Sequence, residues 1–286
     1  MACAGLSIAA PVSLAQIKPR EVSSEFLNQI TLYAQYAAAT YVTENTNSPN
    51  SKITCPAGNC PLVEAADTTT LTEFEYIEEF GDVAGFLAVD RTNEEIVLSF
   101  RGTASVETWI ANLNFEQTQV NDICDGCEAH AGFMRSWGSV ANVTMDSVQN
   151  AMQTNPGFKL IVTGHSFGGA MATIAATVLR QSGYVLDMFS YGAPRLGNMA
   201  FAEYVSAQGS NFRVTHTNDM VPRVPPRMLG YRQTSPEYWI TTGDNTPVGT
   251  ADIVMINEAD SDQGNTGQTI QSVMAHRWYT GCMFLC

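Results

Sequence analysis

The chain has 286 residues, of which about 45% are hydrophobic, and it carries a formal net charge of −14 at pH 7. This length and apolar content are sufficient for one large core, and α/β folds of this size often form a single domain. The basic residues do not cluster, so a polyanion such as a nucleic acid would meet mainly repulsion. We therefore expect one domain and exclude nucleic acid as a partner.

The N-terminus has the composition of an export signal. The residues after Met1 are small or apolar up to Ala15, as in the later part of a signal peptide, so residues 1–15 are predicted to be a signal-peptide remnant. Basic residues that usually open such a signal are absent, and the alternative is an apolar N-terminus without regular structure. Residues 16–20 are typical of a short propeptide, which leaves a single domain over 21–286. No other stretch approaches the roughly 20 apolar residues that a membrane-spanning helix needs.

Two close cysteine pairs lie in loops, Cys55 with Cys60 and Cys124 with Cys127. Both pairs are typical of small disulfide loops, which form in exported proteins. The alternative for the second pair is a zinc site, but the spacing of the first pair does not suit one, and we predict no metal. Cys282 and Cys286 are left to pair with each other or with a partner that the sequence does not reveal.

The expected secondary structure alternates between helix and strand. Apolar residues at helical spacing predict helices, the first of them capped by Ser23 or Ser24, over residues 21–41, 134–152, 169–181 and 198–205. Short apolar runs bounded by turn residues predict strands over residues 74–80, 85–90, 95–100, 159–163, 186–191 and 211–217. This alternation favours a mostly parallel central sheet flanked by helices on both faces, in an α/β sandwich of three layers.

The segment Gly164-His165-Ser166-Phe167-Gly168 matches the pattern G-x-S-x-G. It directly follows the predicted strand 159–163 and directly precedes an alanine-rich helix, which is the context that a nucleophile elbow requires. A chance match in a glycine-rich loop is the alternative, and the flanking strand and helix argue against it. We therefore predict that Ser166 is the nucleophile of a hydrolase with the α/β-hydrolase fold.

A serine nucleophile needs a general base, and the chain has only four histidines. In this fold the base follows the serine and the acid along the chain, which excludes His130. His165 is held inside the elbow, and His216 lies in a predicted strand before the best acid. His276 is therefore the expected base, against the alternative of a surface or capping histidine.

The base in turn needs a carboxylate to orient it. Asp219 directly follows the predicted strand 211–217, at the edge of the sheet where active-site loops gather. Other acidic residues after the serine lie at strand starts or in solvated loops: Asp187, Asp244, Asp252, Asp260 and Asp262. We select Asp219, against the alternative of an ordinary turn formed by Asn218 and Asp219.

An acyl-transfer site also needs donors for an oxyanion. The residue after the nucleophile, Phe167, supplies one backbone N–H, and Thr103, just past the predicted strand 95–100, is expected to supply its N–H and hydroxyl. The alternative for Thr103 is a simple turn residue. A short amphipathic helix then begins after Ser105, with Glu107 in its first turn. Its apolar stripe, which we interpret as a movable lid rather than as core, consists of Val106, Trp109, Ile110 and Leu113.

From residue 21 onward the chain resembles the fungal class 3 lipases. The resemblance rests on Ile96-Val-Leu-Ser-Phe-Arg-Gly102, Gly164-His-Ser-Phe-Gly-Gly169, Phe189-Ser-Tyr-Gly-Ala-Pro-Arg195 and Thr215-His-Thr-Asn-Asp219. It implies an α/β-hydrolase fold with a short helical lid. It further implies a catalytic triad of Ser166, Asp219 and His276, and an oxyanion hole formed by Thr103 and Phe167. By the same resemblance, Trp109 lies on the lid and Tyr41 in the pocket wall.

The chain departs from the family pattern at three places. Val42 stands where the family has a cysteine that pairs with the C-terminal one, so Cys286 lacks that partner. Unless another crosslink replaces this disulfide, a contribution of about 4 kcal/mol to the stability of the fold is expected to be absent. Arg277 replaces an apolar residue after the catalytic histidine, which leaves the acyl-chain preference open. A glycosylation sequon in the early loop of the family is lost at Ser51-Lys-Ile-Thr54, whereas Asn142-Val-Thr144 forms another on a predicted helix.

The leading hypothesis is a secreted triacylglycerol lipase that hydrolyses long-chain acylglycerols at a lipid droplet or emulsion interface. An esterase for feruloyl or other soluble esters is the enzymatic alternative, and phospholipase A1 action is a side activity left open. A non-catalytic lipid-binding protein on the same scaffold is the alternative from another class. We expect no cofactor, and either a monomer or a weak homodimer formed through exposed lids.

Overall fold

The computed structural model describes residues 21–76, 82–103 and 105–284. The predicted signal remnant and propeptide, the end of the predicted strand 74–80, and Cys286 therefore lie outside the described residues. Helix α1 (Ser24–Ala39) begins after Ser23, whose hydroxyl accepts a hydrogen bond from the backbone N–H of Phe26. Of the two candidate caps, Ser23 is thus the one that the structure uses.

An eight-stranded sheet runs through the molecule in the order β1-β2-β3-β6-β7-β8-β9-β10. Its strands are β1 (Thr68–Tyr76), β2 (Val83–Asp90), β3 (Glu95–Phe100), β6 (Lys159–His165), β7 (Leu186–Tyr191), β8 (Asn211–His216), β9 (Glu237–Ile240) and β10 (Ile253–Ile256). The five strands from β3 to β9 pair in parallel, and the strands at both edges are antiparallel. The predicted mostly parallel sheet is confirmed, although β9 and β10 were not predicted because each spans only four residues.

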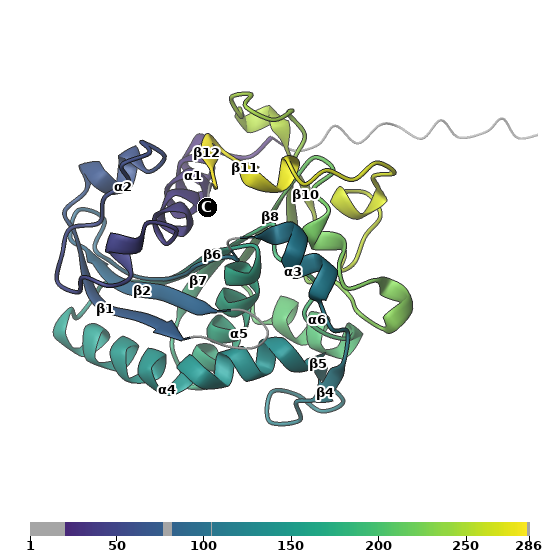
Figure 1. Ribbon diagram of the computed structural model, residues 1–286, viewed down its shortest axis with the longest axis horizontal. Helices are drawn as coiled ribbons and strands as arrows, with labels where there is room; N and C mark the ends of the chain where they lie inside the picture. The colour runs from purple at the N-terminus through teal and green to yellow at the C-terminus, as the bar shows by residue number, and fades with distance from the viewer. Residues whose placement is uncertain (1–20, 77–81, 104, 285–286) are drawn as a thin grey trace, which may run out of the picture.

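Helices cover both faces of this sheet, as Figure 1 shows. Helix α1 lies on one face, and the other face carries α4 (Ala131–Thr154), α5 (Phe167–Gln181) and α6 (Met199–Ala207). Alternate residues of the buried strands feed two separate cores, so Val97 packs with α1 while Ile96 and Leu98 pack with α4 and α5. This is the predicted three-layer α/β arrangement.

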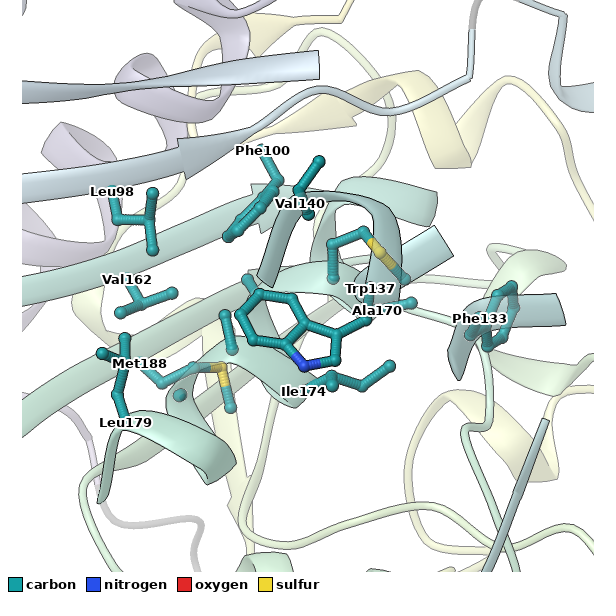
Figure 2. Packing of buried hydrophobic residues seen from close by; sticks show 14 of the residues in the cluster. Leu98, Phe100, Phe133, Trp137, Val140, Val162, Ala170, Ile174, Leu179 and Met188 are labelled. Atoms are coloured by element: carbon teal, nitrogen blue, oxygen red, sulfur yellow. The ribbon is translucent and has the colours of Figure 1, made fainter. Parts of the chain in front are cut away.

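Figure 2 shows how the second core is filled. The indole of Trp137 from α4 lies among side chains of the strands, such as Val162, and Ile174 of α5. Trp137 is 5% exposed and Ile174 is fully buried. Because α5 starts at the end of β6 and is fixed by this packing, the turn between β6 and α5 is held at a defined place on the sheet.

Shorter helices, strands and turns lie between and after these elements. They comprise α2 (Pro61–Ala65), α3 (Val106–Asn112), β4 (Gln117–Gln119), β5 (Glu128–His130), β11 (Trp278–Tyr279), β12 (Cys282–Met283) and single 3₁₀ turns at Thr43–Asn45, Val221–Arg223, Arg227–Leu229, Thr250–Asp252, Asn265–Gly267 and Ala275–Arg277. In the described part of the chain, no helix is both long and apolar enough to span a bilayer.

Both predicted cysteine loops are closed by disulfides, Cys55–Cys60 and Cys124–Cys127. Sulfurs joined in a disulfide are not thiolate ligands, so the zinc alternative for the second pair is wrong. Cys282 is buried in β12 and forms no disulfide within the described residues.

Candidate active site

Ser166 lies on a sharp turn between β6 and α5. Its backbone has φ of 59° and ψ of −127°, a region that a residue with a side chain rarely occupies. The turn is possible only because of the glycines around it: a Cβ on Gly164 would lie 2.2 Å from the Gly168 carbonyl oxygen, and one on Gly168 would lie 2.2 Å from the Phe100 carbonyl oxygen. The predicted elbow is therefore present, with the serine fully buried.

Beyond the next two strands, Asp219 and His276 meet in a fully buried pair. The carboxylate oxygens of Asp219 lie 2.9 and 3.0 Å from Nδ1 of His276. The carboxylate also accepts hydrogen bonds from the Val221 backbone N–H, at 2.8 Å, and from the Tyr279 hydroxyl, at 2.5 Å. Asp219 thus lies against three donors, and we assign the hydrogen at Nδ1 of His276 from this geometry.

Tyr279 was not identified from the sequence, because only its position relative to Asp219 distinguishes it from other aromatic residues. Burial, followed by the neighbouring Asp219, raises the pKa of its phenol well above the usual value. The hydroxyl is therefore a donor to the carboxylate at any ordinary pH.

The loops that carry the pair are joined by backbone hydrogen bonds. Ser272 donates to the carbonyl of Asn218 at 3.0 Å and accepts from the backbone N–H of Met220 at 3.3 Å. The side-chain amide of Asn265 donates to the carbonyl of Asp219 at 2.8 Å. These contacts explain how residues separated by 57 positions are held in register, and they involve polar loop residues that the sequence did not single out.

Gly192, at the end of β7, leaves room for the pair. Its φ of 58° is left-handed, and a Cβ there would lie 2.8 Å from Oδ2 of Asp219 and 2.9 Å from Cε1 of His276. The backbone N–H of Ser166 donates to the carbonyl of Tyr191, the residue before Gly192, at 2.8 Å. Ser166 follows β6 and Asp219 follows β8, and the pair of Asp219 and His276 lies beside the end of β7. All three residues are therefore gathered around the C-terminal ends of these strands.

Two atoms at this place are buried without a hydrogen-bond partner among the described residues, namely Oγ of Ser166 and Nε2 of His276. Buried polar groups are normally paired, and an unpaired one costs about 1–3 kcal/mol. These are the atoms between which a proton would move in nucleophilic acyl transfer, and in resting enzymes such contacts are often long or poorly aligned. The arrangement is chemically suited to that reaction.

The other histidines are occupied elsewhere. Nδ1 of His130 accepts from the Phe133 backbone N–H and so caps α4, and burial lowers the pKa of His130 to about 4. The two ring nitrogens of His216 lie 2.9 and 2.8 Å from the carbonyl oxygens of Ala275 and Thr242. These contacts agree with the elimination of both residues as the base.

The two predicted oxyanion donors follow neighbouring strands, at the C-terminal ends of these strands. Phe100 and Gly164 are paired in the parallel register of β3 and β6, so Thr103 follows one strand just as Phe167 follows its neighbour. Phe167 is fully buried and is the first residue of α5, so its N–H belongs to the unpaired donors of a helix N-terminus. The two segments are thus adjacent.

Helix α3 packs over this edge, next to α5 in Figure 1. Its residues Val106 and Trp109 are buried, at 4% and 7% exposure, while Ile110 is half-buried, as is Leu113 just past the helix end. The ring of Trp109 lies 6.4 Å from that of Phe167, beside the elbow. Ser105 occupies the cap position without a capping bond to the backbone, and its hydroxyl contacts Thr108 instead.

Arg277 and Glu107 form an ion pair of 3.1 Å between the histidine-bearing turn and α3. The sequence marked Arg277 as unusual but gave no partner for it. Their side chains are 33% and 55% exposed, so the pair lies at the surface of the protein.

Tyr41 contacts His165 of the elbow. Its hydroxyl is 2.8 Å from Nδ1 of His165, and a Cβ on Gly102, one residue before Thr103, would lie 2.0 Å from that hydroxyl oxygen. Tyr41 therefore contacts both the elbow and the loop that leads to Thr103. Among the described residues, no group of three His, Cys, Asp or Glu side chains is arranged to hold a metal ion.

A mostly parallel sheet with a strained serine after β6 defines the α/β-hydrolase class. The family model described as "Lipase (class 3)" matches residues 97–229, and the model "Lipase 3 N-terminal region" matches residues 1–72. The chain belongs to the class 3 lipase family. This confirms the family that the sequence motifs resembled and the prediction of a lipase-type ester hydrolase.

Several relatives cover nearly the whole chain. Secreted mono- and diacylglycerol lipase A of Penicillium camembertii is 43% identical over 283 residues, which are 97% of this chain and 91% of the relative. Secreted mono- and diacylglycerol lipase 1 of Fusarium solani is 39% identical over 267 residues, 93% of this chain and 79% of the relative. The crystal structure of the mono- and diacylglycerol lipase from Aspergillus oryzae has a TM-score of 0.85 and 37% identity, covering 91% of this chain and 96% of that chain.

Proposed function

We propose that this protein is a secreted acylglycerol lipase in which Ser166, His276 and Asp219 form the catalytic triad. The observation that carries the proposal is the buried serine on a strained elbow, next to a buried Asp-His pair whose Nε2 has no partner among the described residues. The secreted relatives of the same family support export of this chain. Its division into a signal remnant, a propeptide and a domain from residue 21 remains a prediction.

In the proposed reaction, Nε2 of His276 takes the proton of Ser166 as Oγ attacks the ester carbonyl. Donors on Thr103 and Phe167 hold the oxyanion, an effect worth about 3–4 kcal/mol per donor in comparable sites. The alcohol leaves with the proton from His276, and water then releases the fatty acid by the same steps. Asp219 holds the tautomer of His276 and stabilises the imidazolium that forms.

The properties of helix α3 support the proposal that the substrate is a lipid. Its closed position buries Val106 and Trp109, and the indole N–H of Trp109 is buried without a partner among the residues that the structure describes. An unpaired buried N–H disfavours the closed state by about 1–3 kcal/mol, so outward movement of α3 regains that energy. We infer that α3 is a lid with an apolar inner face, formed by the stripe predicted from the sequence, which is suited to contact a lipid surface.

The sequence favoured triacylglycerols, whereas the relatives are named for mono- and diacylglycerols. We therefore propose acylglycerol esters as the substrate class, with partial acylglycerols as the second candidate for the preferred substrate. A feruloyl or other soluble esterase is not favoured, because the inner face of α3 is apolar. A monomer or weak homodimer remains a prediction.

Activity per enzyme molecule is expected to rise when a long-chain diacylglycerol or triacylglycerol passes its solubility limit, because a lipid surface stabilises the open lid. Titration of fatty-acid release across that limit measures the rise, and the ratio of the two rates identifies the preferred acylglycerol. An inactive, heat-treated sample controls for spontaneous hydrolysis. A flat response with higher rates on soluble aryl esters would contradict the lid proposal and favour the esterase.

The ion pair between Glu107 and Arg277 is expected to hold the lid closed. Glu107→Gln should raise the rate on a soluble short-chain ester by about two- to fivefold, since exposed pairs contribute up to ~1 kcal/mol. The matched control is Glu116→Gln, which removes an exposed carboxylate just after α3 without touching the pair. The double variant Glu107→Arg with Arg277→Glu, in which the charges are exchanged, should return to the original rate. Equal gains in Glu107→Gln and Glu116→Gln would contradict a specific role of the ion pair in holding the lid closed.

A further inference from the structure

His165, which the proposed reaction does not use, is enclosed between the elbow and the base. It is 2% exposed, and its ring stacks on Phe284 at a centroid distance of 3.9 Å and lies against the ring of His276, tilted by 31°, at 4.4 Å. Nε2 of His165 lies 2.8 Å from the backbone carbonyl oxygen of His276, and Nδ1 lies 2.8 Å from the hydroxyl of Tyr41. One side chain thus connects the nucleophile's turn, the base and Tyr41.

These partners allow one arrangement of hydrogens. A carbonyl oxygen only accepts, so Nε2 of His165 must carry the hydrogen and donate it to His276. In a neutral ring Nδ1 is then bare and accepts from the hydroxyl of Tyr41. Burial, and then the adjacent His276, lowers the pKa of His165 well below its usual value, which agrees with a neutral ring.

We propose that His165 is a positioning residue, which fixes the backbone of His276 through its Nε2–H and thereby aims the base at Ser166. The inference rests on the proposed triad. A side-chain donor to the base's own carbonyl fixes the turn Ala275–Arg277, on which the imidazole is mounted. The hydroxyl of Tyr41 selects the required tautomer, and a neutral ring adds no repulsion when the adjacent His276 becomes cationic.

The groups that face His165 are few. The hydroxyl of Tyr41, which follows α1, contacts it, and Phe284 stacks on it. The rings of His276 and of Tyr279 in β11 lie 4.4 and 5.8 Å from its ring. Of these, only His276 is of a type that titrates near neutral pH. A change in the pH dependence of catalysis after substitution of His165 therefore reports on His276.

Two amide variants, which lose the ring alike, separate positioning from packing. His165→Gln places an amide N–H where Nε2 was and keeps the donor to His276, whereas His165→Asn keeps an acceptor near Tyr41 and loses that donor. The measurements are kcat and KM on a soluble short-chain ester, the pH profile of kcat/KM, the rate of Ser166 labelling by a phosphonate, and the melting temperature, all on the complete secreted protein.

We expect His165→Asn to lower kcat and the labelling rate by about 10–100-fold, with KM little changed and an altered apparent pKa in the pH profile. His165→Gln should recover most of that loss at a similar melting temperature. Equal losses in both variants, in proportion to lost stability, would overturn the inference. If wild-type Ser166 is not labelled at all, the proposed triad itself fails, so the two failures are distinguishable.

If His165→Asn does not fold, nitrogen NMR of the histidine-labelled wild type replaces it as the test. The expected result is a neutral His165 ring with its hydrogen on Nε2 between pH 6 and pH 8, and His165→Gln identifies its signals by their loss. A hydrogen on Nδ1, or a cationic ring in that interval, would overturn the inference.

Discussion

Replacement of Ser166 by alanine is expected to lower kcat by about 10⁶-fold, because no other group can form the acyl-enzyme. The residual rate should come from the oxyanion donors and from substrate binding, which act without the nucleophile. The measurement is ester hydrolysis on a soluble short-chain ester and on a long-chain emulsion. Both substrates should be affected equally, since the loss concerns chemistry and not the interface.

The same variant should fold at least as well as the wild type. The Ser166 hydroxyl is fully buried and has no hydrogen-bond partner among the described residues, so its removal takes away an unsatisfied group that costs about 1–3 kcal/mol. Alanine keeps the strained φ, so the elbow itself is unchanged. The melting temperature should therefore stay the same or rise.

Covalent labelling supplies the control. An active-site phosphonate should modify the wild type once, at Ser166, and should leave the alanine variant unmodified by mass spectrometry. Failure of a folded wild-type sample to form this adduct would favour the non-catalytic lipid-binding alternative. Adduct formation at a different serine would show that the nucleophile was assigned to the wrong residue.

Replacement of Asp219 by asparagine is expected to lower kcat by about 10⁴-fold, as in other triads. Asp219 lies against three donors: Nδ1–H of His276, the Tyr279 hydroxyl and the Val221 N–H. Asparagine offers one acceptor oxygen and turns the other atom into a donor, so at least one of these contacts becomes donor against donor. The favoured relief is the other tautomer of His276, whose Nε2 then cannot accept the serine proton.

Two matched variants make this second result specific. Tyr279→Phe removes one donor but leaves the carboxylate and should lower kcat only about 10-fold, as is typical for a residue that supports a catalytic group. Asp244→Asn changes an acid that lies 3.7 Å from His216, away from the proposed triad, and should leave kcat close to the wild-type value. An active Asp219→Asn variant together with an inactive Asp244→Asn variant would reassign the acid.

The elbow could be predicted because its requirements are local. A short buried strand, two glycines and an alanine-rich helix are contiguous in the sequence, and the steric reasons for both glycines act within a few residues or against one neighbouring strand. The strands of the parallel sheet were predicted for the same reason, except for β9 and β10, which are too short for periodicity to detect.

The general base and its carboxylate could also be selected from the sequence, by eliminating the other candidates. With four histidines and a fixed chain order, the sequence left His276 as the base, and it selected Asp219 by its position after a strand. The structure brings these two side chains within 2.9 Å of each other. Their catalytic roles remain the proposal that the variants above test.

Other features have no local signal. Nothing near Tyr279 in the sequence indicates that its hydroxyl reaches Asp219, which is 60 residues away, and nothing near Arg277 indicates a partner on α3, 170 residues away. The same is true of His165, whose neighbours in sequence explain the elbow but not its contacts with Tyr41 and His276. These pairings arise only when distant loops are packed against each other at one edge of the sheet.

The sequence by itself determined the class of fold, the nucleophile's turn and a short list of partners, because strand periodicity, glycine sterics and chain order are properties of the chain. Only the tertiary structure decided which donors surround Asp219, which residue of α3 pairs with Arg277, and which groups contact the ring of His165. Each of these depends on hydrogen-bond distances of about 3 Å between segments far apart in sequence, and that geometry is set by packing of the whole core.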